Sequence, residues 1–78
     1  LIIIEFSKYI FENPDNIDYL RNFLIKYDYN IYNTKYKKQN LDEILNMLKN
    51  LKKRYKTIGN YYLIKNSSIN LKLFLSNE

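Results

Sequence analysis

Apolar residues recur at helical spacing over about residues 14–27. They occupy every third or fourth position, as one buried face of an α-helix requires: Ile17, Leu20, Phe23, Leu24 and Tyr27. Asn13 is a favoured N-cap residue, and Pro14 suits the first helical position. Asp15 and Asp18 follow in the first turn, where the helix dipole favours negative charge. The pattern predicts a helix over about 14–27.

A second stretch with the same spacing begins after Asn40. Its apolar positions lie on one helix face: Leu41, Ile44, Leu45, Leu48, Leu51 and Tyr55. Asn40 and Glu43 have the spacing of a capping box, in which the Asn40 side chain accepts the Glu43 backbone N–H and the Glu43 side chain reaches back. Basic residues crowd the C-terminal half, which also suits the dipole. We expect this helix to include Tyr55 and to end before Gly59.

Three stretches alternate with a period of two instead. Residues 29–36 are rich in Tyr, Ile and Thr, which favour a pleated, half-buried surface. Residues 61–64 and 69–75 alternate in the same way, and the Asn-Ser-Ser segment 66–68 between them has the composition of a turn. We therefore expect a strand over 29–36 and a terminal hairpin.

The first twelve residues fit two interpretations. Ile3, Phe6 and Ile10 share a face at helical spacing, whereas the run Leu1–Ile4 is also typical of a short buried strand. We favour a helix that ends near Glu12. The element order is then α-α-β-α-β-β in one domain over residues 1–78. It predicts an α+β fold, with two to three helices on one face of a small, mainly antiparallel three-stranded sheet.

The composition reflects the codon supply of the gene. Alanine and valine are absent, and Lys, Asn, Ile, Leu, Tyr and Phe, all of which have A/T-rich codons, supply most of the chain. An A/T-rich genome is expected, as in an organelle, a reduced parasite or endosymbiont, or a phage. The abundance of Asn and Tyr is therefore weak evidence of function.

Several kinds of function lack the residues they need. The chain has no His, no Cys and a single Gly, so it offers no thiolate zinc site, no imidazole base and no glycine-rich phosphate loop. We expect no enzymatic activity, no cofactor, no metal and no small-molecule substrate. No apolar run is long enough for a membrane span. Leu1–Phe6 carries Glu5 and no basic residue, so no targeting peptide is expected.

Charge is the clearest functional signal. The net charge is +5, and eight of the 13 basic residues fall within residues 35–56. They precede or follow the start of the second helix or occupy its far end: Lys35, Lys37, Lys38, Lys49, Lys52, Lys53, Arg54 and Lys56. Such a concentration favours a phosphate backbone as partner over a merely solvated face. Tyr32, Tyr36 and Tyr62 offer rings for base stacking, although structural roles are the stronger expectation for them.

The order of elements resembles a ribosomal protein. Residues 14–75 are similar to the N-terminal half of the small-subunit ribosomal protein eight family, through the segments "IDYLRNFLIKY", "NIYNTKYKKQ", "NLDEILNMLKNLKK" and "GNYYLIKNSSINLKLFL". The family's basic turn before its second helix corresponds to Lys35, Lys37 and Lys38. The sequence departs from the family where Arg54-Tyr55-Lys56-Thr57-Ile58 precedes the glycine, and the family's second domain has no counterpart in it.

The resemblance implies a non-enzymatic structural component of a ribosome. Its partners would be ribosomal RNA, contacted through the basic middle of the chain, and neighbouring ribosomal proteins. The A/T-rich codon usage favours an organellar small subunit, in the mitochondrion or another organelle matrix; otherwise a cytoplasmic location is expected. Two alternatives stay open. The first is a protein–protein interaction module, either an accessory subunit of a large complex or a small phage or viral protein that binds a host factor. The second is a winged-helix DNA binder.

Overall fold

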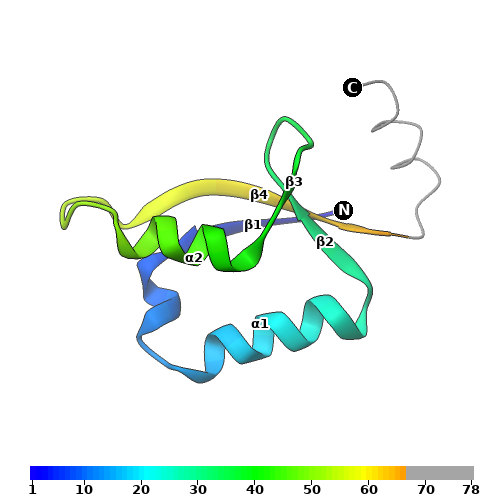
Figure 1. The fold of residues 1–78 in the computed structure, drawn as a ribbon, viewed down its shortest axis with the longest axis horizontal. Helices are drawn as coiled ribbons and strands as arrows, with labels where there is room; N and C mark the ends of the chain where they lie inside the picture. The colour runs from blue at the N-terminus through cyan, green and yellow to red at the C-terminus, as the bar shows by residue number, and fades with distance from the viewer. Residues whose placement is uncertain (67–78) are drawn as a thin grey trace.

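The fold is α+β, as predicted, with two α-helices and a four-stranded antiparallel sheet (Figure 1). The computed structural model describes residues 1–66 of the chain. Its elements are, in order, β1 (Ile2–Ser7), a 3-10 helix η1 (Lys8–Phe11), α1 (Asp15–Lys26), β2 (Tyr29–Tyr32), β3 (Lys38–Gln39), α2 (Leu41–Lys49) and β4 (Thr57–Lys65).

The sheet has the order β1-β4-β2-β3, and every neighbouring pair is antiparallel. β4 is central. It pairs along one edge with β1, where Ile3 lies opposite Tyr62, and along the other with β2, where Ile31 lies opposite Leu63. The predicted sheet had three strands, so the structure adds one at the N-terminus and divides another.

The expected helix in the first twelve residues is wrong, because this segment forms β1 and η1. Alternate residues of β1 face opposite sides of the sheet, so Phe6 is 2% exposed whereas Ile3 is 60% exposed. The run of isoleucines favours a strand, since β-branched side chains pack well on a pleated surface. Pairing with β4, more than fifty residues away, then decides between the two local patterns.

The helix predicted over 14–27 is confirmed as α1. Asn13 ends the preceding segment and accepts the backbone N–H of Asp15 on its Oδ1 atom at 3.0 Å. The apolar side chains of α1 pack against the core without any of them becoming fully buried: Ile17, Leu20, Phe23 and Leu24. Other large side chains of this helix face solvent, with Tyr19 76% and Ile25 75% exposed.

The predicted strand 29–36 is shorter than expected and is followed by a turn. β2 ends at Tyr32, residues 33–37 reverse the chain, and β3 pairs back with β2. Tyr36 has a positive φ of 61°, a left-handed conformation that no regular strand contains. The period-two pattern of the sequence continues across this turn and does not reveal it.

The second helix begins as predicted and ends early. The Asn40 side chain accepts the backbone N–H groups of Asp42 and Glu43 at 2.8 and 3.3 Å, as an N-cap does. The helix ends at Lys49, six residues before Tyr55, the last position predicted on its apolar face. Asn50 is a poor helix former, and the chain must reverse within residues 50–56 to enter β4, so the helix ends there.

β4 contains the only glycine and a β-bulge. Glu5 lies opposite Asn60, but Ser7 lies opposite Thr57, so two residues of β4 face one residue of β1 between these pairs. Gly59 has a φ of +96°, which glycine adopts without steric cost and which such bulges commonly require. The predicted strand 61–64 is thus the end of a longer strand.

The predicted hairpin between 61–64 and 69–75 falls partly outside the described residues. Its first half belongs to β4, whose two edges are both paired at Tyr62 and Leu63, on one side to β1 and on the other to β2. Residues 69–75 lie beyond the part of the chain that the structure describes.

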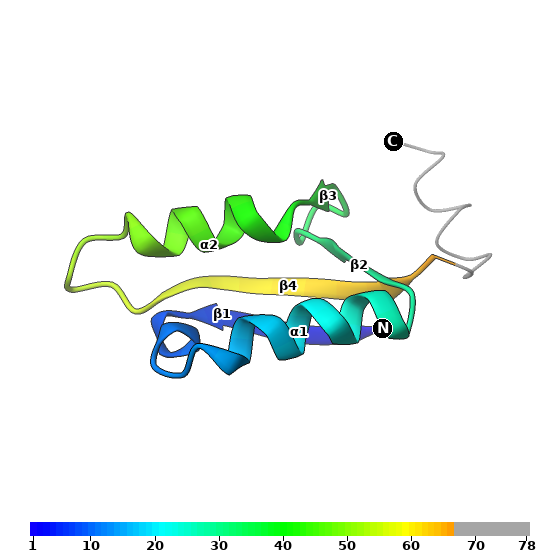
Figure 2. The same ribbon diagram turned by 60° about the horizontal axis from the view of Figure 1, so that its bottom comes forward.

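The core lies between the two helices and one face of the sheet (Figure 2). It consists of apolar side chains from α2 and from the inward positions of β1, β2 and β4: Phe6, Ile31, Leu41, Ile44, Leu45, Leu48, Tyr61 and Leu63. The rings of Phe6 and Tyr61 meet edge to face at 5.2 Å. Ile44 and Leu48 are completely inaccessible, so α2 supplies the centre of the core.

Replacing Leu48 by alanine should lower the free energy of unfolding by about 2–5 kcal/mol, because it leaves a cavity at a fully buried site. Met47→Ala is the matched control, since Met47 precedes Leu48 on the same helix and is 45% exposed. It should change the stability by about 0.5 kcal/mol or less. Urea denaturation followed by circular dichroism measures both. Equal effects would mean that α2 buries a different face.

Candidate nucleic-acid interface

The eight basic residues predicted to bind nucleic acid are all exposed. They form two groups at opposite ends of α2 (Figures 1 and 2). One group surrounds the turn between β2 and β3 and consists of Lys35, Lys37 and Lys38. The other occupies residues 49–56, from the last residue of α2 to the start of β4, and consists of Lys49, Lys52, Lys53, Arg54 and Lys56. We call residues 49–56 the basic loop.

The two groups are too far apart to act as one charged surface. α2 lies between them and has nine residues, which corresponds to about 14 Å of helix. Electrostatic interactions are screened over about 8 Å at physiological ionic strength. The sequence placed the two groups at the two ends of the helix, and this is confirmed. It placed Lys52 to Lys56 on the helix itself, and this is wrong.

The β2–β3 turn is held by Asn33. Its Oδ1 atom accepts the backbone N–H groups of Lys35 and Lys37 at 2.9 and 3.0 Å. Its backbone N–H donates to the Lys37 carbonyl oxygen at 2.9 Å, and its own carbonyl oxygen accepts the Tyr36 N–H at 2.9 Å. The side chains of Lys35 and Lys37 are exposed on this ordered turn.

The basic loop is fastened to β1 and η1 by a residue distant in sequence. The Lys8 Nζ atom donates to the carbonyl oxygens of Leu51 and Lys52 at 3.0 and 3.2 Å. The backbone N–H of Lys8 donates to the Lys56 carbonyl oxygen at 2.8 Å. One residue therefore holds both ends of the loop. Its ammonium group also lies just beyond the C-terminus of α2, where a cation is favourable.

Within the basic loop, residues 52–55 form a tight turn. The Tyr55 N–H donates to the Lys52 carbonyl oxygen at 2.9 Å, so Lys53 and Arg54 occupy the two central positions of a β-turn. The guanidinium carbon of Arg54 lies 4.9 Å from the centre of the Tyr55 ring. At the end of α2, the Lys49 ammonium lies 5.6 Å from the Phe11 ring.

The basic loop has no acidic partner within the described part of the chain. Among residues 1–66 a single ion pair occurs, and it joins Arg21 to Asp42, at the other end of α2. The charges of Lys52, Lys53 and Arg54 are thus compensated by solvent ions alone within that part. Counterions held in this way are released when phosphates replace them, which favours binding.

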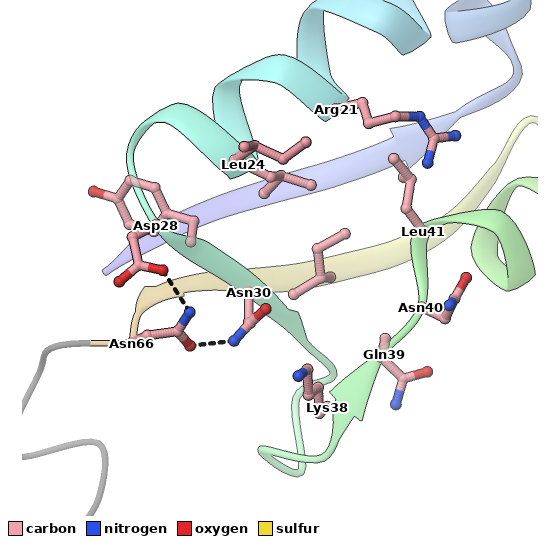
Figure 3. Close-up of a pocket in the computed structure, with 12 residues that line it drawn as sticks. Arg21, Leu24, Asp28, Asn30, Lys38, Gln39, Asn40, Leu41 and Asn66 are labelled. Atoms are coloured by element: carbon pink, nitrogen blue, oxygen red, sulfur yellow. Dashed lines mark hydrogen bonds between the residues drawn. The ribbon is translucent and has the colours of Figure 1, made fainter.

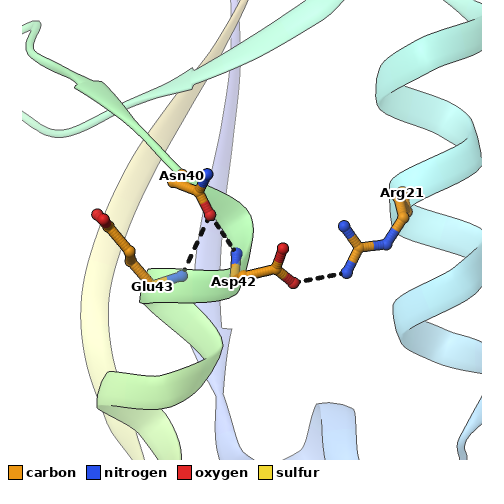
Figure 4. A network of polar contacts seen from close by, with 4 residues as sticks. All are labelled: Arg21, Asn40, Asp42 and Glu43. Carbon is orange, nitrogen blue, oxygen red and sulfur yellow. Dashed lines mark hydrogen bonds and ion pairs between the residues drawn. The ribbon is translucent and has the colours of Figure 1, made fainter.

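The Arg21–Asp42 ion pair joins α1 to the first turn of α2 (Figure 4). The Arg21 Nη2 atom donates to Asp42 Oδ1 at 2.8 Å. This hydrogen bond, together with the positive charge, lowers the pKa of the Asp42 carboxyl group below its ordinary value and raises the pKa of Arg21. Both side chains are accessible to solvent, so the pair is structural and only weakly stabilising.

A cleft of about 520 Å³ lies between α1 and the segment that runs from β2 to the start of α2 (Figure 3). The Asn66 side chain donates to Asp28 Oδ1 at 2.7 Å and accepts the Asn30 amide. These polar groups are satisfied by one another. Asp28 is the sole carboxylate of the lining, so the cleft holds no pair of groups for acid–base chemistry.

Metal and membrane sites were sought within residues 1–66. No group of three or more His, Cys, Asp or Glu side chains in that range is placed to hold a metal ion. No helix there is long and apolar enough to cross a bilayer.

The structure adds two residues to the candidate interface that the sequence did not indicate. Lys8 lies in an N-terminal half that carries net negative charge, and more than forty residues separate it from the carbonyl groups it binds, so no local signal identifies it. Tyr55 was expected on the apolar face of the helix. It is 48% exposed in the loop instead, and an earlier helix end would have been needed to predict this.

No protein-family model, curated protein or solved structure matches this chain. The similarity to the ribosomal family therefore stays a prediction.

Replacing Lys8 by methionine should loosen the basic loop, because the side chain keeps its length and loses its three donors. We expect faster hydrogen exchange of the Tyr55 amide and a loss of about 1–2 kcal/mol in the free energy of unfolding. Lys26→Met is the control, since the Lys26 ammonium lies near the Tyr27 ring on α1. If both variants exchange alike, Lys8 does not hold the loop.

The Arg21–Asp42 pair should make stability depend on acid pH. Because the pKa of Asp42 is lower in the folded than in the unfolded chain, its contribution is fully present above the unfolded pKa, about 4, and is lost as the pH falls through the folded pKa. Wild type should therefore exceed Asp42→Asn in stability at neutral pH, and the difference should vanish in strong acid. Urea titrations from neutral to acid pH measure it. In the Arg21→Gln background, a persisting pH-dependent difference would contradict the pairing.

Proposed function

We propose that this protein is a non-enzymatic structural component of a ribosome that docks on ribosomal RNA through its basic loop. The observation that carries the proposal is the basic loop itself. Five exposed cations, Lys8 as fastener, and no acidic partner within residues 1–66 make a projecting, pre-ordered phosphate-binding surface. A turn that is ordered before binding loses less entropy when it contacts RNA.

The composition and the predicted resemblance support a ribosome as the setting. The chain is small, basic and rich in residues with A/T-rich codons, as expected of a gene in an organellar genome. Lys35, Lys37 and Lys38 correspond to the basic turn of the ribosomal protein eight family and supply a second phosphate contact. The organelle matrix, most directly that of the mitochondrion, is the proposed location.

A second candidate function is a protein–protein interaction module, and one observation favours it. Large apolar side chains are exposed on α1 and β1, including Tyr19, Ile25 and Ile3 at 76%, 75% and 60%. Singly exposed apolar residues are common, but several on two elements indicate a partner surface. In a ribosome, the same surface would contact neighbouring ribosomal proteins.

The winged-helix alternative is not proposed again. A winged helix needs two consecutive helices before its hairpin. In this chain β2 and β3 separate α1 from α2, so residues 1–66 do not contain that arrangement.

Reversing the charge of the basic loop should weaken RNA binding. In Lys53→Glu/Arg54→Glu, two exposed cations at the centre of the turn are replaced, so we expect roughly tenfold weaker binding or more. The slope of log affinity against log salt should become shallower by roughly 1. Fluorescence anisotropy with a labelled ribosomal RNA fragment over a salt series measures both, and circular dichroism checks the fold.

Tyr19→Ser/Ile25→Ser is the matched control, because it changes two exposed side chains on α1 without altering charge. RNA affinity should be unchanged in this variant. A protein–protein module predicts the reverse: RNA binding that is absent at about 50 mM salt, where electrostatic contacts are strong, and loss of a protein partner in the α1 variant.

A further inference from the structure

Tyr55 is an exposed aromatic residue at the most basic point of the chain. Its side chain is 48% exposed, whereas Tyr61, six residues later in β4, is 8% exposed and belongs to the core. Its backbone is held in place, because the Tyr55 N–H closes the turn onto Lys52. The ring is therefore positioned at the surface by an ordered turn.

A second planar group lies beside this ring. The Arg54 guanidinium carbon is 4.9 Å from the ring centre, and the guanidinium group, like an aromatic ring, presents a flat surface on which a nucleobase can stack. The exposed cations Lys52, Lys53 and Lys56 flank both groups in sequence. One turn thus combines a stacking surface with phosphate-binding charge.

The most exposed tyrosine of residues 1–66 has a different environment. Tyr19, 76% exposed, lies on α1 after the acidic residues Asp15 and Asp18 of its first turn. Negative charge there disfavours a phosphate backbone, so exposure alone does not make a tyrosine a stacking site. Tyr55 differs from Tyr19 in its basic surroundings.

We infer that Tyr55 is a stacking site for an unpaired nucleobase of single-stranded RNA, with the lysines of the basic loop contacting the phosphates on either side. The inference rests on the proposed function and narrows its ligand. In a duplex the faces of the bases are covered by their neighbours, so only an unpaired base can stack on the ring. The basic loop therefore binds single strands, loops or bulges in preference to a continuous duplex.

Two probes of equal charge separate stacking from phosphate contacts. The first is a labelled single-stranded RNA of about 12 nucleotides, within the usual range of site sizes. The second has the same length and backbone but abasic residues in its centre. Wild type should bind the first roughly 5- to 150-fold more tightly, as expected for one stacked base. Tyr55→Leu should abolish this ratio and leave the salt dependence unchanged, whereas Tyr55→Phe should retain the ratio.

The outcomes distinguish this inference from the proposed function. Equal binding of both probes by the wild type, with a steep salt dependence, overturns the stacking site and leaves RNA docking intact. A ratio that persists in Tyr55→Leu also overturns it. Failure of both probes to bind at about 50 mM salt overturns both proposals. The comparison of probes on the wild type needs no variant, so a folding defect in Tyr55→Leu leaves the inference open to refutation.

Discussion

The double pairing of β4 is the constraint on which the rest of the structure depends. This strand hydrogen-bonds to β1 on one edge and to β2 on the other, and its inward residues Tyr61 and Leu63 lie under both helices. Because α2 packs across the same face, the chain must leave α2 and turn back before it can enter β4. The basic loop is that reversal. The position of the candidate interface thus follows from the topology of the sheet.

Local signals in the sequence predicted the elements whose causes are local. Asn40 caps α2 as expected, and the apolar stripe of α1 appears where its spacing placed it. The failures have non-local causes. The N-terminal segment offers both helical and strand spacing, and pairing with β4 selects the strand. The early end of α2 is required by the return to β4. For the interface, all eight basic residues are exposed as predicted, but Lys8 and Tyr55 could be recognised only once the loop they share was known.

The distribution of charge divides the molecule by function. The ion pair of Arg21 and Asp42 lies at the start of α2 and links the helices, whereas the cations at its other end have no acidic partner within residues 1–66. A small chain that leaves such a group of charges uncompensated loses stability through their repulsion. Binding to a polyanion removes that repulsion. RNA docking therefore explains a feature that the folding of this domain alone would disfavour.

The central claim is that the basic loop, fastened by Lys8, is the surface that meets RNA. Titration of the isotope-labelled protein with a short single-stranded RNA, followed by amide NMR shifts, tests it most directly because every backbone position is observed at once. The account predicts the largest changes at Lys8 and residues 49–56, with smaller ones at the β2–β3 turn. Changes concentrated on the exposed face of α1, or none at low salt, would contradict it.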